Sequence, residues 1–137
     1  PVRKKYSREH ILVLIFIYYY KGILSISDIQ TLLGPVTEKF FHKDEAFDIQ
    51  SVYEEVFQVG YDQIEALKQH VIAEYECAMG TFEDAPEENR EFLKLFSFIC
   101  FLSFDVYMKK MLIEKLIDEI KVDGFRTEQK EDNKRGQ

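Results

Sequence analysis

The chain has 137 residues, of which 46% are hydrophobic and 15% aromatic, so it can bury a core and is too apolar to be disordered over most of its length. Its net charge of −7 excludes a protein that binds nucleic acid over its whole surface, because such surfaces are strongly basic. The two cysteines, Cys77 and Cys100, argue against a disulfide framework or a cysteine-based zinc site, so we expect reduced thiols and a cytoplasmic location.

Two apolar runs resemble membrane or export segments but lack their full pattern. Residues 11–20 follow a basic lead, as in a signal peptide, but the run ends in tyrosines and Lys21 with no cleavage site after it. Residues 93–104 contain Ser97 and Ser103 and fall short of the ~18 apolar residues of a membrane span. We therefore expect no membrane segment.

The first predicted helix covers residues 7–21. Ser7 suits the N-cap, because its hydroxyl accepts a hydrogen bond from a free N–H of the first turn. Apolar residues then recur at the spacing of one helix face, namely Ile11, Leu14, Ile15 and Tyr18. Gly22 is expected to end the helix in the left-handed conformation.

A second, shorter helix is predicted over residues 25–33. Ser25 and Asp28 match the capping pattern in which each side chain satisfies the other's free backbone group. Gly34 and Pro35 are expected to stop it. Residues 35–48 then read as an irregular connection held to the core by phenylalanines, with a solvated turn at residues 42–45.

A long third helix is predicted over residues 49–79, with Asp48 as its N-cap and Gly60 as a possible kink. Its apolar stripe consists of Tyr53, Phe57, Tyr61, Ile64, Leu67, Val71, Tyr75 and Ala78. His70, Glu74 and Cys77 share a face at i, i+4, i+7. We interpret them as a helix margin rather than a metal site, because no further ligand has the required spacing.

The clearest break is residues 80–91, read as a helix–helix hairpin in which Gly80 ends one helix and Asp84 caps the next. The fourth helix is predicted over residues 86–121, with Gly124 as a stop and residues 122–137 disordered. Its apolar side chains exceed what four helices can cover, so we expect a homodimer. The predicted dimer residues are Phe98, Phe101, Leu102, Met108, Leu112 and Leu116.

The N-terminal pattern resembles MerR-like winged helix-turn-helix regulators. The matching features are the run K-K-Y-S-R-E-H-I at residues 4–11, the helix after it, and the capped second helix. The pattern is most similar to a bacterial family of uncharacterised proteins with a MerR-like DNA-binding half. That family also carries a C-terminal Tyr-x-x-x-hydrophobe-Leu signature, matched here by residues 107–112.

The predicted elements together give an all-α helical bundle of two short N-terminal helices and two long antiparallel helices. The resemblance implies that the base-reading helix lies upstream of residue 1. Residues 1–34 would then end a DNA-binding domain, and residues 35–121 would form a helical dimerisation and regulatory domain. Contacts to the DNA backbone are expected from the basic lead, namely Arg3, Lys4, Lys5, Tyr6 and Arg8. The alternative interpretation of this lead is a frayed terminus with solvated charges.

The sequence offers two alternatives to a regulator that binds DNA as the full-length protein. A ligand-sensing or protein-interaction module without DNA binding would enclose a small apolar effector among Tyr18–Tyr20, Phe96–Phe104 and Tyr107. An enzyme is not expected, because the chain carries no Gly-rich phosphate loop, no activated nucleophile with a spaced histidine and no metal signature. No cofactor is predicted.

Overall fold

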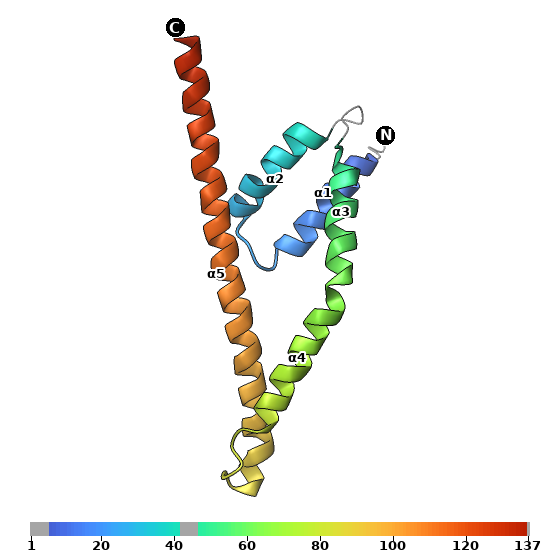
Figure 1. Ribbon diagram of the computed structural model, residues 1–137, viewed down its shortest axis with the longest axis vertical. Helices are drawn as coiled ribbons and strands as arrows, with labels where there is room; N and C mark the ends of the chain where they lie inside the picture. Colours follow the sequence, from blue (N-terminus) through green and yellow to red (C-terminus); the bar gives the residue numbers. More distant parts are fainter. Residues whose placement is uncertain (1–5, 42–46, 137) are drawn as a thin grey trace, which may run out of the picture. The chain divides into compact units, whose positions relative to one another are not determined.

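The computed structural model describes residues 6–41 and 47–136, and in residues 125–135 it describes the backbone alone. The helices, in chain order, are α1 (Arg8–Tyr20), α2 (Ile26–Phe40), α3 (Ile49–Asp62), α4 (Ile64–Met79) and α5 (Glu87–Arg135) (Figure 1). The described residues contain no strand, so the predicted all-α helical bundle is confirmed.

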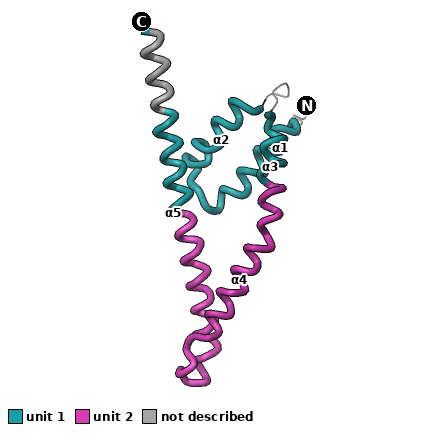
Figure 2. The backbone as a smooth tube through the Cα atoms, viewed as in Figure 1, with its two compact units in different colours: residues 1–56, 112–137 teal, residues 57–111 magenta. Residues whose placement is uncertain are grey.

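The chain divides into two compact units, coloured separately in Figure 2. We call residues 1–56 with 112–137 the terminal unit and residues 57–111 the hairpin unit. These divisions fall at Val56 and Met111, and not at the ends of the domains expected from the sequence, residues 34 and 121. The functional domains of residues 1–34 and 35–121 remain a prediction.

Helix α1 begins as predicted and ends differently. The Ser7 hydroxyl accepts a hydrogen bond from the backbone N–H of His10, so the predicted cap is confirmed. At the other end, the N–H groups of Ile23 and Leu24 both donate to the carbonyl of Tyr20. No described glycine has a positive φ, so the left-handed Gly22 was a wrong prediction, and a tight turn closes this helix instead.

The core of the terminal unit lies where α1 and α2 meet α3 and the later part of α5. Its buried apolar side chains are Leu12, Phe16, Leu24, Ile29, Leu33, Ile49 and Ile117. Phe16 meets Tyr53 edge-on at 6.2 Å between ring centroids, which joins α1 to α3. Lys121 of α5 pairs with Asp28 of α2 at 3.2 Å.

Helix α2 runs through the residues that were expected to stop it. Pro35 removes one backbone donor, and its ring usually clashes with the Cβ of the residue before it. That residue is Gly34, which has no Cβ, so the helical conformation remains accessible. The helix continues to Phe40, and the predicted irregular segment is helical over residues 35–40. The predicted turn at residues 42–45 lies outside the described residues.

The predicted third helix is two helices. The Asp48 carboxylate accepts hydrogen bonds from the N–H and hydroxyl of Ser51, at 2.9 and 2.8 Å, so the predicted N-cap is confirmed. The interruption falls at Gln63, whose N–H donates to the carbonyl of Gly60, three residues back instead of four. The break in the helix therefore falls at Gln63, about one turn after Gly60, where a kink was expected.

The hairpin unit is held at its tip by a small group of polar contacts. The Lys94 ammonium donates to the carbonyl of Met79 at the end of α4 and pairs with Glu83 at 2.7 Å. The Thr81 hydroxyl donates to the buried Ser97 hydroxyl at 3.0 Å. Helix α5 begins at Glu87, directly after Pro86, so the cap expected at Asp84 is not the residue that precedes the helix.

Helix α5 continues past Gly124 to Arg135, so the predicted stop at residue 121 and the disordered segment after it are wrong. A single glycine inside a helix costs about 1 kcal/mol relative to alanine, which charged helix formers on both sides can offset. Within the described part of the chain, no helix combines the length and the apolar character needed to cross a bilayer.

Candidate functional site

The tip of α1 carries the described part of the predicted DNA contact. Arg8 is the first residue of the helix and is exposed, and the Tyr6 side chain is 71% exposed. Arg3, Lys4 and Lys5 lie outside the described residues. A helix N-terminus also presents free N–H groups to an anion. The two described side chains are thus placed where a phosphate can reach them.

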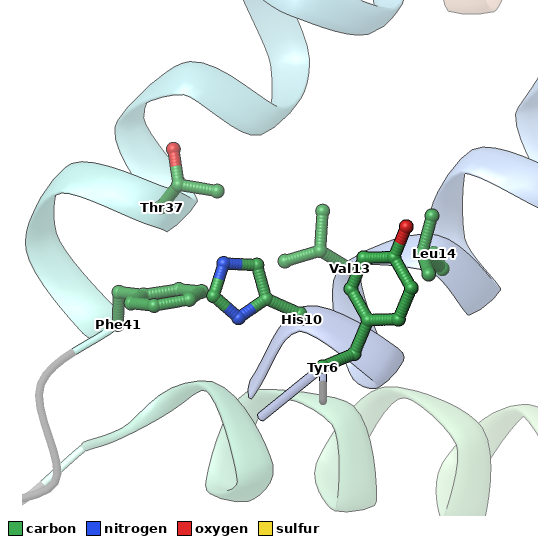
Figure 3. A pocket seen from close by; sticks show the side chains of 6 residues that line it. All are labelled: Tyr6, His10, Val13, Leu14, Thr37 and Phe41. Carbon is green, nitrogen blue, oxygen red and sulfur yellow. The ribbon is translucent and has the colours of Figure 1, made fainter. Parts of the chain in front are cut away.

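A pocket of about 330 Å³ lies beside this tip, in the terminal unit (Figure 3). Its lining residues come from α1, the end of α2 and the residues next to them, namely Tyr6, His10, Val13, Leu14, Thr37 and Phe41. The His10 ring lies between two other rings, with Phe41 edge-on at 5.0 Å and Tyr6 at 6.4 Å. The pocket is therefore mainly aromatic and aliphatic, with a few polar groups.

The histidine in this pocket is tied to the helix cap. His10 Nδ1 lies 2.5 Å from the Ser7 hydroxyl oxygen, and that oxygen also accepts from the His10 backbone N–H. A hydroxyl that caps a helix in this way is a structural group, so we assign the Ser7–His10 pair no catalytic role. The prediction that this chain is not an enzyme remains a prediction.

The pocket was not predicted, because the sequence was interpreted as ending the second helix at Gly34. Thr37 and Phe41 reach His10 only because α2 continues past Pro35. The available signal was the glycine directly before the proline, which removes the Cβ part of the usual clash.

The tyrosines at the end of α1 do not enclose a ligand. Tyr18 and Tyr19 are exposed and meet edge-on, and the Lys21 ammonium lies 5.1 Å from the centre of the Tyr18 ring. Tyr20 stacks on Phe16 and is half-buried, and this burial raises the pKa of its hydroxyl. Tyr18 and Tyr19, two of the tyrosines expected to enclose an effector, therefore lie on an open surface.

A line of apolar side chains runs along α5 at alternating steps of four and three residues. We call it the α5 seam, and it consists of Leu95, Ile99, Leu102, Val106, Ile113, Leu116 and Ile120, with Lys109 filling the one polar step. Most of these side chains are half-exposed or more, and Val106 is 62% exposed. Steps of four and three are the spacing by which paired helices bury a shared line of contacts.

The predicted dimer residues fall into three groups. Leu102 and Leu116 belong to the α5 seam. Met108 and Leu112 are exposed but lie on another side of the helix. The other two are partly covered by α4 of the same chain: the ring of Phe98 meets Tyr75 edge-on at 5.4 Å, and Phe101 lines a hollow with Glu74 and Cys77.

The face of α4 that was interpreted from sequence as a helix margin lies beside an acidic residue of α5. His70 Nε2 lies 3.1 Å from Glu74 Oε1, and an Asp105 oxygen lies within 4.8 Å of both ligand groups. Cys77, the third residue of the sequence pattern, is not a member of this group. Glu74 lies on α4 and Asp105 lies on α5, on the other side of the hairpin turn. Residue spacing along one helix therefore could not predict that the two carboxylates lie close together.

The N-terminal part of the chain matches a known sequence family. Residues 1–56 match a sequence family described as "Domain of unknown function (DUF1836)". No curated protein and no solved structure matches the chain. The matched residues are the first segment of the terminal unit and hold the whole pocket at His10. The match assigns no activity, and the resemblance to MerR-like regulators remains a prediction.

Proposed function

We propose that this chain is the dimerising portion of a DNA-binding transcription regulator, and that it contacts the DNA backbone at the tip of α1. The observation that carries the proposal is the α5 seam, because a monomer leaves these apolar side chains in water. A regulator built as a symmetric dimer places two such tips on one duplex. Base reading would belong to a helix upstream of residue 1.

The occupant of the seam is a second copy of this chain. A heptad line is self-complementary, since the same residues meet across a twofold axis. Lys109 is the one charged residue in the line, and a single lysine at such a position selects one register and oligomer state while lowering stability. These features favour the pairing of two α5 helices. They do not favour a groove that binds an unrelated protein.

The DNA contact is proposed for Tyr6 and Arg8, together with the basic residues that precede them. Each phosphate that a cation neutralises releases counterions, so binding weakens as salt rises. The chain as a whole is acidic, so the expected affinity for DNA without the upstream helix is low and confined to low salt. Contact is therefore local to one end of α1.

The proposal is tested by titrating a fluorescent 30-base-pair duplex with the 137-residue chain at several salt concentrations. We expect weak binding whose salt slope falls by about 0.9 in Arg8→Gln, the value for one phosphate contact. The matched control is Lys21→Gln, at the other end of α1, and its slope should equal that of the wild type. Absence of binding at low salt, or equal slopes in all three proteins, would contradict the DNA contact.

A second candidate, a ligand-sensing module, is favoured by the pocket at His10. Its volume of about 330 Å³ suits a small molecule, and its walls are mostly rings and aliphatic groups. The probe is indole, followed by the NMR signals of the His10 ring. Saturable shifts that disappear in Val13→Phe, which fills the pocket, would support this function. Unchanged signals at millimolar indole would count against it.

A further inference from the structure

Three side chains of the hairpin unit converge on one point. His70 and Glu74 lie one turn apart on α4, and Asp105 projects from α5. One nitrogen or oxygen atom from each lies within 4.8 Å of the other two. We propose that His70, Glu74 and Asp105 bind a divalent transition-metal ion of the Zn²⁺ class.

The Glu74 carboxylate supplies the observation that points to a ligand. Its Oε1 faces His70, but its Oε2 is buried and has no hydrogen-bond partner. The side chain as a whole is only 16% exposed. Burying an unpaired carboxylate oxygen is unfavourable, because the atom gives up water and gains nothing. A cation bound by the Glu74 carboxylate would offset this cost through its charge.

The identity of the donors selects the class of cation. Imidazole nitrogen suits zinc and its neighbours in the first transition row, whereas Ca²⁺ and Mg²⁺ take oxygen ligands. The two carboxylates of Glu74 and Asp105 carry the charge that neutralises a divalent ion. One nitrogen and two oxygens therefore favour Zn²⁺ over the alkaline-earth ions.

Three protein ligands leave one position of a tetrahedral ion for solvent. Glu74 also lines a hollow of about 370 Å³ together with Ala73, Cys77, Phe101 and Phe104. This hollow gives a water molecule room to reach the ion. The Cys77 thiol lies in the same hollow but outside the group of three converging atoms.

Lys109 is the one cation paired with this cluster by a described contact. Its ammonium lies 3.2 Å from Asp105 Oδ2. A carboxylate has two oxygens, so Lys109 can hold one while the other binds the metal. Hydrogen bonds of this kind fix the orientation of metal-binding carboxylates. Lys109 is thus a positioning residue for Asp105.

The test is calorimetric titration of the metal-free 137-residue chain with Zn²⁺ and, separately, with Mg²⁺. We expect one Zn²⁺ per chain and no comparable heat from Mg²⁺. Glu74→Gln and Asp105→Asn keep the size of each side chain and should each weaken Zn²⁺ binding by at least about tenfold. The matched control, Glu76→Gln, changes an exposed acid of the same helix and should bind like the wild type.

A second measurement needs no change at the carboxylates. In the NMR spectrum of the wild-type chain, Zn²⁺ should move the ring signals of His70 and leave those of His10 in place. Equal Zn²⁺ affinity in wild type and Glu74→Gln, equal heats from Mg²⁺ and Zn²⁺, or an unmoved His70 ring would each overturn the proposal. The three proposed ligands lie outside both the DNA contact and the α5 seam, and none of these variants changes Lys109, which the seam and the cluster share. The two proposals can therefore fail separately.

Discussion

At the scale of single residues, Lys94 links the two helices of the hairpin unit. Its ammonium donates to the carbonyl of Met79 and to the Glu83 carboxylate, while its side chain is largely buried. Carbonyl groups at a helix C-terminus have no partner within the helix, so a buried lysine stabilises them by charge and by hydrogen bonding. The end of α4 therefore depends on a residue 15 positions beyond Met79.

Replacing this lysine should destabilise the chain. Lys94→Met keeps the apolar stem and removes both polar contacts, and we expect the free energy of unfolding to fall by about 1.5–3 kcal/mol. Urea denaturation followed by circular dichroism measures the change. The control is Lys115→Met, an exposed position where the same substitution should cost no more than about 0.5 kcal/mol. Equal losses in both variants would contradict this role.

The ion pair between Lys94 and Glu83 makes the stability of the fold depend on pH. The hydrogen bond from Lys94, followed by the charge of that ammonium, lowers the pKa of Glu83 below its usual value of 4.5. A carboxyl whose pKa is lower in the folded state stabilises the fold above its unfolded pKa and loses this effect as the pH falls. Its contribution is therefore complete at pH 6 and declines below pH 4.5.

The expected result is that wild type and Glu83→Gln differ more in urea midpoint at pH 6 than at pH 3.5. Asp48 behaves in the same sense, because the N–H and hydroxyl of Ser51 lower its pKa. The Asp48 effect is common to both proteins and cancels in the comparison. A difference that stays constant or grows on acidification would show that the Lys94 contact does not act on the Glu83 charge.

At the scale of helices, α2 can continue through Pro35 because the residue directly before the proline is Gly34. Proline inside a helix removes a donor, and its ring disfavours the helical conformation of the preceding residue, in part through a clash with that residue's Cβ. Glycine avoids the second penalty but is itself a weak helix former. The Gly34–Pro35 pair therefore permits a helix without stabilising it. The effects of substitutions at the two positions on the free energy of unfolding should not be additive.

We expect Pro35→Ala to raise the free energy of unfolding by about 1–3 kcal/mol, because it restores a backbone donor. Gly34→Ala alone should give no gain, since its new Cβ meets the proline ring. In the Pro35→Ala background, the same change should add about 1 kcal/mol, because no other group lies within 4 Å of that Cβ. Urea denaturation of the four proteins measures the coupling. Equal effects of Gly34→Ala in both backgrounds would contradict the account.

The starts of α1 and α3 could be predicted from neighbouring residues, whereas the ends of α2 and α5 could not. Ser7 and Asp48 reveal their helices because a cap is decided by residues three positions apart. The ends at Gly34 and Gly124 were wrong because a glycine or proline lowers helix stability without ending a helix when the flanking residues favour it. The pocket at His10 and the position of Asp105 depend on contacts between helices, which no spacing along one helix contains.

At the scale of the whole molecule, the apolar composition of α5 exceeds what its own chain covers. The buried apolar core of the described residues is small, whereas many large side chains of α5 lie at the surface. Burial of one such side chain contributes roughly 1.5–3 kcal/mol, so pairing of two α5 seams would be strongly favourable. The dimer expected from composition thus becomes a proposal for one surface, the α5 seam, which contains Leu102 and Leu116 of the six predicted residues. Phe98 and Phe101 instead lie partly against α4 of the same chain.

Val106 and Met111 form a matched pair for this question. Both are exposed, at 62% and 50%, and both lie on α5 in the hairpin unit. Five residues separate them, which places them about 140° apart around the helix. Only Val106 belongs to the α5 seam. A new charge at either position meets water in the monomer, so the two substitutions should differ only if the seam is an interface.

The most direct measurement is the mass of the chain by sedimentation equilibrium at several concentrations. We expect a dimer for the wild type and for Met111→Glu, and a monomer for Val106→Glu at the same concentration, with the helical circular dichroism of all three retained. A monomeric wild type, or a Val106→Glu variant that dimerises as tightly as the wild type, would contradict pairing through α5.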